Sequence, residues 1–528
     1  MSIARNTYDE LPYDCAAAYP YSQPNCLATI ATLFGMTPPP VQNSRILELG
    51  CANGTNILAI GYALPQAQCF GIDSSIRQIE QGQALLAQLN LPNVTLQHKD
   101  ILAIDADWGY FDYIIAHGIF SWVSDAVQEK MLAICQHNLA PNGVAYISFN
   151  TRPGWNMRST IRDMMLYHVQ QFDDIPTQVQ QIQALVRFLG EATKEKKDLH
   201  SVFVQKEFNI LHQQPKSYLY HDFLEEYNKP LYFHEFATRL KQHDLQYLGD
   251  AHIQTMFSED LTSEITAQLQ NLTVIHREQY TDFLTNRTFR HSLLCHQNLQ
   301  LQRSLYPAVI KQFYLASQLK PVDKGVDIVS NQSVKFEQPG IGGVDENTPI
   351  VKSALFYLYQ QWPQAIEFKE LVTKATLQLN TASQGAYEMP ENLAILEETL
   401  AEALLKCYLG GVIEAMIYPP QCVTEIGPTP KVSDLARAQI QQGHDTVSNL
   451  RGEQLRYPAL LKDIIPVLDG QHDKAALLEI LRDLTARGII VANKDEHAVN
   501  PETVTHEMLQ KLLQDILTHL ASKALLVQ

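Results

Sequence analysis

Residues 45–73, RILELGCANGTNILAIGYALPQAQCFGID, constrain the fold of this chain more than any other stretch. An apolar run is followed by a glycine-containing turn, by a second apolar run over 57–64, and by a third that closes on Asp73. This order predicts a strand, a turn, a helix and a second strand, which together make one βαβ unit. Gly50 allows a sharp turn at the end of the first strand, and Gly54 leaves room where a helix N-terminus meets a ligand.

The variant of the turn narrows the class of ligand. It reads Glu48-x-Gly50-x-Ala52-x-Gly54, whereas a dinucleotide site has G-x-G-x-x-G. The pattern resembles that of class I S-adenosylmethionine (SAM) methyltransferases, in which glycine is usual at the position of Ala52. An acid about 20 residues further on, here Asp73, is placed to accept hydrogen bonds from two ribose hydroxyls. A degenerate unit that binds nothing is the alternative.

Strands and helices continue to alternate up to about residue 150. The runs NVTLQH, FDYIIAHG and GVAYISFN predict strands, and SSIRQIEQGQALLAQLN and DAVQEKMLAICQHNL predict helices. This alternation predicts an α/β fold with a parallel, doubly wound, Rossmann-like sheet. Asp100 follows the third strand, where it is placed to meet an adenine amino group. No metal site is predicted, and the expected cofactor-binding residues are Glu48, Gly50, Cys51, Gly54, Asp73, Ser74, Asp100, Ile101 and His117.

An N-terminal arm and two loops are expected to form the acceptor side of the site. The arm is rich in tyrosine and is expected to fold across the strand ends, although its tyrosines can equally serve to fasten it to the core. The loops HGIFSWV and NTRPGW each follow a strand and carry one tryptophan, which is either a pocket wall or packing. The candidate substrate-pocket residues are Tyr13, Tyr19, Tyr21, Phe120, Trp122, Asn150 and Trp155.

Composition limits the function classes. A chain of 528 residues is too long for one core. Its formal net charge of −17 disfavours nucleic acid and anionic membrane as partners. Eight scattered cysteines without a CxxC pair indicate a reducing compartment, and no signal-like or membrane-spanning run is present. We therefore expect a soluble cytoplasmic protein.

The expected organisation has four parts. Residues 1–170 form the SAM-binding core, and 171–300 contribute a helical insertion followed by a helix and strands that complete the sheet. Residues 301–349, which end in the Gly- and Pro-rich EQPGIGGVDENTP, are predicted to be a helix and linker. Residues 350–528 are predicted to be mostly helical and to contain a winged-helix unit near the end. Acids on its second helix favour protein docking or homodimer formation over DNA binding.

Several blocks of the chain resemble a known family. The arm, the glycine turn, the two loops, PLYFHEFATRL and FLTNRTFRHSLLCH are similar to bacterial class I methyltransferases with a methyltransferase regulatory domain, and the C-terminal part resembles rickettsial-type protein lysine methyltransferases. The resemblance implies a SAM-dependent enzyme that acts on protein lysines. The family usually has Thr-His-Pro where this chain has Ser22-Gln23-Pro24, and often has tyrosine at Arg152. Both departures lie on the expected substrate side.

Two alternatives remain open from the sequence. One is a SAM-dependent methyltransferase of a small molecule. The other is a SAM-binding regulator that performs no chemistry. No single side chain is identified as a general base, because an aligned site can supply much of the rate enhancement for methyl transfer.

Overall fold

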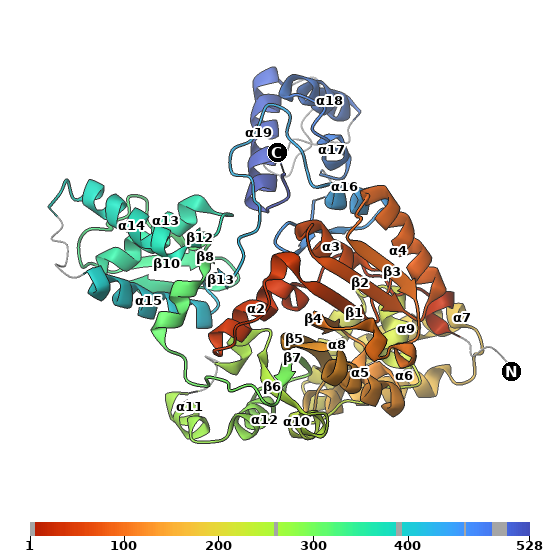
Figure 1. Cartoon of the computed structure of the whole chain (residues 1–528). Helices are drawn as coiled ribbons and strands as arrows, with labels where there is room; N and C mark the ends of the chain where they lie inside the picture. Colours follow the sequence, from red (N-terminus) through yellow and green to blue (C-terminus); the bar gives the residue numbers. More distant parts are fainter. Residues whose placement is uncertain (1–5, 258–261, 387–392, 459–460, 488–503, 528) are drawn as a thin grey trace.

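The computed structural model describes residues 6–257, 262–386, 393–458, 461–487 and 504–527. Figure 1 shows a large α/β body that contains most residues before 300, a smaller lobe around residues 314–416, and a helical group from residue 434 onward. The helical group lies beside the first helices of the α/β body.

A seven-stranded sheet forms the centre of the body. Its strands are β1 (Arg45–Leu49), β2 (Gln68–Asp73), β3 (Val94–His98), β4 (Phe111–Ala116), β5 (Leu139–Asn150), β6 (Leu245–Asp250) and β7 (Phe289–His296), in the spatial order β3-β2-β1-β4-β5-β7-β6. The first five are parallel, and β7 is antiparallel to both β5 and β6. The predicted doubly wound sheet, completed by two late strands, is confirmed. Strand order reverses between β1 and β4, which is where open α/β sheets bind ligands.

Amphipathic helices cover this sheet. In α4, Ser75 caps the first turn by accepting the backbone N–H of Gln78, and Ile79 and Leu85 are buried while Glu80 is exposed. The helices of the body are α2 (Pro24–Leu33), α3 (Thr55–Ala63), α4 (Ile76–Leu89), α5 (Asp125–Asn138), α10 (Phe233–Gln242), α11 (Ser263–Gln270) and α12 (Val274–Thr285).

The expected helical insertion lies between β5 and α10. It consists of α6 (Gly154–Val169), α7 (Ile175–Thr193), α8 (Leu199–Leu211) and α9 (Lys216–Leu224), and it has its own apolar core around Met165, Ile182 and Phe223. The N-terminal arm, with α1 (Thr7–Glu10), meets α9, because Nε2 of His221 lies 2.6 Å from the Leu11 carbonyl. The insertion and the arm together therefore cover the strand ends of the sheet.

The segment predicted to be a linker is instead a small sheet. Strands β9 (Lys320–Pro321), β10 (Val334–Gln338) and β11 (Gly342–Glu346) form a three-stranded antiparallel sheet. Gly340 has φ +79° in the turn of the β10–β11 hairpin, and Phe336 is fully buried. The prediction was wrong because glycine and proline mark a hairpin turn as readily as a linker.

The remainder is mainly helical, as predicted. The lobe contains β8 (Tyr314–Ala316), β12 (Ile366–Glu367), β13 (Glu414–Met416), α13 (Pro349–Gln361), α14 (Phe368–Ala382) and α15 (Leu393–Leu409). The C-terminal group contains α16 (Asp434–Gln441), β14 (Thr446–Ser448), β15 (Gln454–Arg456), α17 (Leu461–Ile464), α18 (Lys474–Ala486) and α19 (His506–Ser522), with a second apolar core. The short strand predicted at GIIVAN, residues 488–493, lies outside the described residues.

The C-terminal group is tied to the arm. Gln439 donates to the Ala16 carbonyl at 3.0 Å, and the Ala18 N–H donates to the Ser448 hydroxyl at 2.9 Å. The arm is consequently held from one side by this group and from the other by α9. Among the described helices, none has both the length and the apolar character needed to cross a bilayer.

Candidate active site

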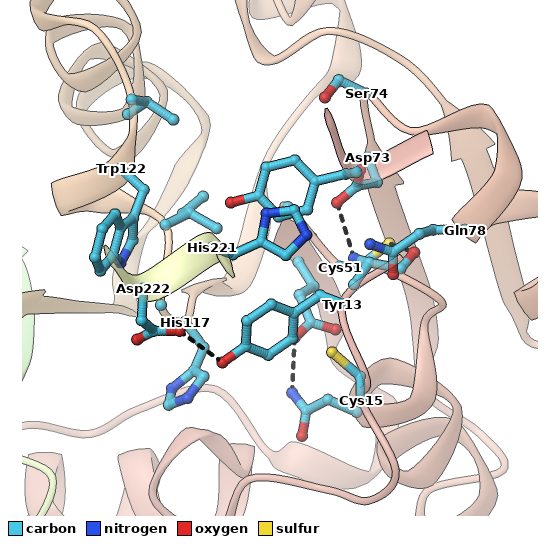
Figure 2. Close-up of a pocket in the computed structure, with 18 of the residues that line it drawn as sticks. Tyr13, Cys15, Cys51, Asp73, Ser74, Gln78, His117, Trp122, His221 and Asp222 are labelled. Atoms are coloured by element: carbon cyan, nitrogen blue, oxygen red, sulfur yellow. Dashed lines mark hydrogen bonds between the residues drawn. The ribbon is translucent and has the colours of Figure 1, made fainter. Parts of the chain in front are cut away.

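A cavity of about 600 Å³ lies at the carboxyl ends of the central parallel strands. Its walls come from the turn after β1, the ends of β2, β4 and β5, the arm, and helices α6 and α9. It brings together most of the residues selected from the sequence, namely Tyr13, Tyr19, Glu48, Gly50, Cys51, Asp73, Ser74, Asp100, Ile101, His117, Trp122, Asn150 and Trp155. Figure 2 shows this cavity with its labelled side chains.

The turn after β1 depends on left-handed backbone conformations. Gly50, Ala52 and Gly54 have φ of +68°, +51° and +75°, a region that residues with a side chain rarely adopt. Ala52 therefore carries strain at a position where the resemblance leads us to expect glycine. The Asp73 carboxylate accepts the backbone N–H groups of Ala52 and Ser75, both at 2.8 Å. Asp73 thus orders the turn in addition to facing the cavity.

Glu48 lies buried beneath the same turn. Its Oε1 atom accepts a hydrogen bond from Asn56 at 2.8 Å. Burial raises the pKa of Glu48 to about 8, against the opposing effect of that hydrogen bond. Gln23 donates to Asn56 at 3.0 Å. The residue that replaces the family's usual histidine therefore lies one side chain behind the cavity, where it supports Asn56.

His117, which directly follows β4, lines the cavity with an uncharged imidazole. Its Nδ1 lies 2.8 Å from the Tyr146 hydroxyl, which in turn lies 2.7 Å from Nδ1 of His291. The Tyr19 ring stacks on His117 with ring centroids 3.8 Å apart. Burial, and secondarily the charge of His291, lower the pKa of His117 to about 3, so this imidazole is uncharged at neutral pH.

The other end of the cavity is aromatic. Trp122 and Trp155 meet edge to face, with ring centroids 5.9 Å apart and an interplanar angle of 77°. Tyr13, from the arm, donates its hydroxyl to Oδ2 of Asp222 at 3.2 Å. In Figure 2, Asp222 and Trp122 lie on one side of the Tyr13 ring, whereas Asp73 lies on the other. The cavity therefore has two chemically different ends.

Three of the residues selected from the sequence are not among the described residues that line this cavity: Gly54, Tyr21 and Phe120. Tyr21 stacks on His252 with centroids 4.6 Å apart, and Phe120 is fully buried against Phe236. The expectation that both aromatic residues belong to the substrate pocket is thus corrected. Neighbouring side chains in an irregular loop point alternately to cavity and core, and sequence spacing does not reveal which.

Helix α9 contributes residues that the sequence analysis did not select. Tyr218, His221 and Asp222 line the cavity, and the arm adds Tyr8, whose ring stacks on His221 with centroids 4.1 Å apart. Gln78 and Arg158 also line it. The signal available in the sequence was KSYLYHDFL, a helix that places a histidine and an acid among aromatic residues.

A second cavity, of about 810 Å³, adjoins the aromatic end. It lies among α6, α8, η6 (Ile253–Met256) and the α12–β7 connection, and it shares Arg158, Thr288 and Phe289 with the first cavity. Leu199, on its wall, is 90% exposed. The aromatic end thus borders an open, partly apolar surface.

The first cavity fits SAM. Gln78 Oε1 is a buried acceptor atom of a lining residue, and it has no hydrogen-bond partner among the described residues. Such an atom calls for a ligand that carries N–H or O–H donors, as the amino-acid and ribose parts of SAM do. The cavity also has space for a ligand beside Gly118, because beyond the neighbouring residues of the chain no described atom lies within 4 Å of the position that a Cβ would take there.

Comparison with known proteins agrees with this geometry. Residues 46–143 match a methyltransferase domain, 215–296 a predicted methyltransferase regulatory domain, and 429–525 the PKMT C-terminal winged helix domain. The uncharacterized protein RP789 of Rickettsia prowazekii is 33% identical over 531 residues, which covers 99% of this chain and 94% of that protein. PKMT2 from Rickettsia typhi is 29% identical, with a TM-score of 0.86 over 98% of this chain and 100% of its own. Its structure in complex with AdoHcy gives a TM-score of 0.87 over the same shares.

The sheet, the glycine turn and these matches define a class I methyltransferase that depends on SAM. The chain belongs to the same family as RP789 and is similar to PKMT2 over nearly its whole length. It combines a methyltransferase domain, a regulatory domain and a C-terminal winged helix.

Proposed function

We propose that this enzyme transfers methyl groups from SAM to lysine side chains of proteins. The observation that carries the proposal is the match with PKMT2, a protein lysine methyltransferase, over 98% of the chain. The matched region includes the helical insertion and the C-terminal group as well as the methyltransferase domain. A match limited to the methyltransferase domain would support only the use of SAM, because enzymes with many different substrates share that fold.

We infer that the end of the cavity near β1 and β2 holds the cofactor. In this proposal Asp73 binds the ribose hydroxyls, and Asp100 binds the adenine amino group. The proposed contacts also include Glu48, Gly50, Cys51, Ser74, Ile101 and His117, while Gly54 shapes the start of α3. The cofactor supplies a methyl group on a positively charged sulfur. The protein's task is mainly to align the acceptor with this group and to exclude water.

The aromatic end suits the acceptor side chain. Tyr13, Trp122 and Trp155 line it, and aromatic faces bind both an apolar stem and a cation. The adjoining second cavity supports a macromolecular acceptor, because it offers space for polypeptide on either side of the modified lysine.

The described cysteines are free thiols, which supports a location in the reducing cytoplasm.

Transfer of radioactive methyl groups tests the proposal. The purified protein is incubated with methyl-labelled SAM and a cell lysate, and the acid-precipitable fraction is hydrolysed and searched for methylated lysine. We expect label in methyl-lysine, and we expect it to disappear with Asp73→Ala. Asp105→Ala, which alters an exposed acid that is not among the residues lining the cavity, is the matched control.

Two other results would contradict the proposal in different ways. Label that stays in the soluble fraction would indicate a small-molecule acceptor. No transfer to any fraction, despite AdoHcy binding, would indicate a SAM-binding regulator.

A further inference from the structure

The aromatic end of the cavity contains one carboxylate that is not neutralised by a basic side chain. Asp222, on α9, is half-buried and lines the cavity. The Tyr13 hydroxyl, which is 3.2 Å from Oδ2, is its one hydrogen-bond donor from a side chain in the part of the chain that the structure describes. A buried carboxylate with so few partners is costly unless a cation approaches it.

The nearest basic side chain is engaged elsewhere. Nε of Arg158 pairs with Glu207 at 3.1 Å, and its Nη2 donates to the Tyr218 hydroxyl at 3.2 Å. The Arg158 charge is therefore largely balanced by Glu207. This leaves the charge of Asp222 to dominate the aromatic end.

His221, the neighbour of Asp222 in α9, is also engaged. Its Nδ1 lies 2.6 Å from Oε1 of Glu225, and its Nε2 lies 2.6 Å from the Leu11 carbonyl. One ring nitrogen faces the residue that follows α9, and the other faces the arm, so neither is available to Asp222. Burial raises the pKa of Asp222 to about 6, against the opposing effects of Tyr13, Arg158 and His221, which leaves it ionised at neutral pH and above.

We propose that the Asp222 carboxylate binds the ammonium group of the methyl acceptor, between the rings of Tyr13 and Trp122 and on the side of the cavity opposite Asp73. The inference rests on the proposed function and deepens it, because it assigns the acceptor a positive charge in its resting state. A carboxylate and aromatic faces attract the same cation. A neutral hydroxyl acceptor would leave the buried Asp222 charge without a counter-charge.

Steady-state kinetics with a lysine-containing protein acceptor provide the first test. In Asp222→Asn we expect the acceptor KM to rise about tenfold or more, while the Kd for AdoHcy stays within about twofold. Glu226→Gln removes an exposed acid just beyond the end of α9 and is the matched control. An unchanged acceptor KM in Asp222→Asn would overturn the inference while leaving lysine methylation intact.

The pH profile separates a charge effect from a structural one. As the pH falls through about 6, Asp222 takes up a proton and loses its attraction for the acceptor. The wild-type kcat/KM should therefore fall more steeply with acid than that of Asp222→Asn. The other titratable or charged groups that interact with Asp222 are Tyr8, Tyr13, Arg158, Tyr218 and His221, and they are present in both proteins. Parallel profiles would count against the proposal.

A binding measurement keeps the inference testable even if no acceptor protein is found. Ligand-observed NMR on the full chain saturated with AdoHcy should show binding of n-butylammonium, which mimics the lysine end, and no binding of 1-butanol. Asp222→Asn should abolish the ammonium signal, and Glu226→Gln should retain it. Butylammonium binding without lysine methylation would support the cation site and refute the protein acceptor. Equal binding by wild type and Asp222→Asn would refute the cation site alone.

Discussion

Replacement of Asp73 by asparagine is a near-isosteric change at the point where the turn and the proposed ribose site meet. The wild-type carboxylate accepts two backbone N–H groups at 2.8 Å, from Ala52 and Ser75. Asparagine replaces one of these oxygens with an NH₂ group, which cannot accept. The variant therefore loses at least one charge-assisted hydrogen bond, worth about 1.5–3 kcal/mol, together with the charge that attracts the ribose hydroxyls.

A loss of the same size in the proposed contact with the ribose hydroxyls would weaken the AdoHcy Kd by about tenfold to 150-fold. Calorimetric titration of the purified variant with AdoHcy measures the Kd. Urea unfolding without ligand shows how much of the loss comes from the turn itself. Asp105→Asn serves as the control, because Asp105 is exposed and, among the described residues, its carboxylate accepts only the local N–H of Asp107. A Kd for Asp73→Asn within about twofold of wild type would refute the assigned role.

Three further predictions concern stability and the acceptor. Arg290 is fully buried and donates to Asp282 through two nitrogens at 2.8 Å and to Glu278 at 3.1 Å. Arg290→Met leaves Glu278 buried without this cation and Asp282 with Arg287 alone, so it should lower the free energy of unfolding by about 3–5 kcal/mol. A loss below about 1 kcal/mol in urea unfolding would be the contrary result. Glu48 has a pKa of about 8 in the folded chain against an ordinary 4.5, so between these pH values the folded state holds the extra proton and stability falls as pH rises. In Glu48→Gln, the fall in unfolding free energy from pH 5 to pH 9 should shrink by about 4 kcal/mol. Equal falls in both proteins would contradict this. Trp122→Ala should raise the acceptor KM by about threefold to 30-fold at an unchanged AdoHcy Kd, and a selective loss of AdoHcy binding would place Trp122 at the wrong end of the cavity.

The cofactor end of the site was predictable because its contacts are local. Asp73 reaches Ala52 across 21 residues, within one βαβ unit whose geometry is nearly constant wherever it occurs. The two late strands, β6 and β7, were correctly assigned to the sheet because many methyltransferase sheets end with a sixth strand and an antiparallel seventh.

The irregular segments were less predictable. EQPGIGGVDENTP contains the turn and second strand of a hairpin, and a turn and a linker have the same composition. Tyr21 and Phe120 were assigned to the pocket by proximity to residues that do line it, although in the structure both pack away from it.

The amino-acid sequence by itself determined the sheet, the glycine turn and the acidic residues at the strand ends, because strand and helix periodicity and left-handed turns are properties of short segments. The acceptor end, by contrast, forms through long-range packing. Tyr13 and Asp222 are 209 residues apart and belong to an arm and an inserted helix. The hydrogen bond between Tyr13 and Asp222 depends on how the helical insertion packs over the strand ends. No local sequence pattern encodes that packing.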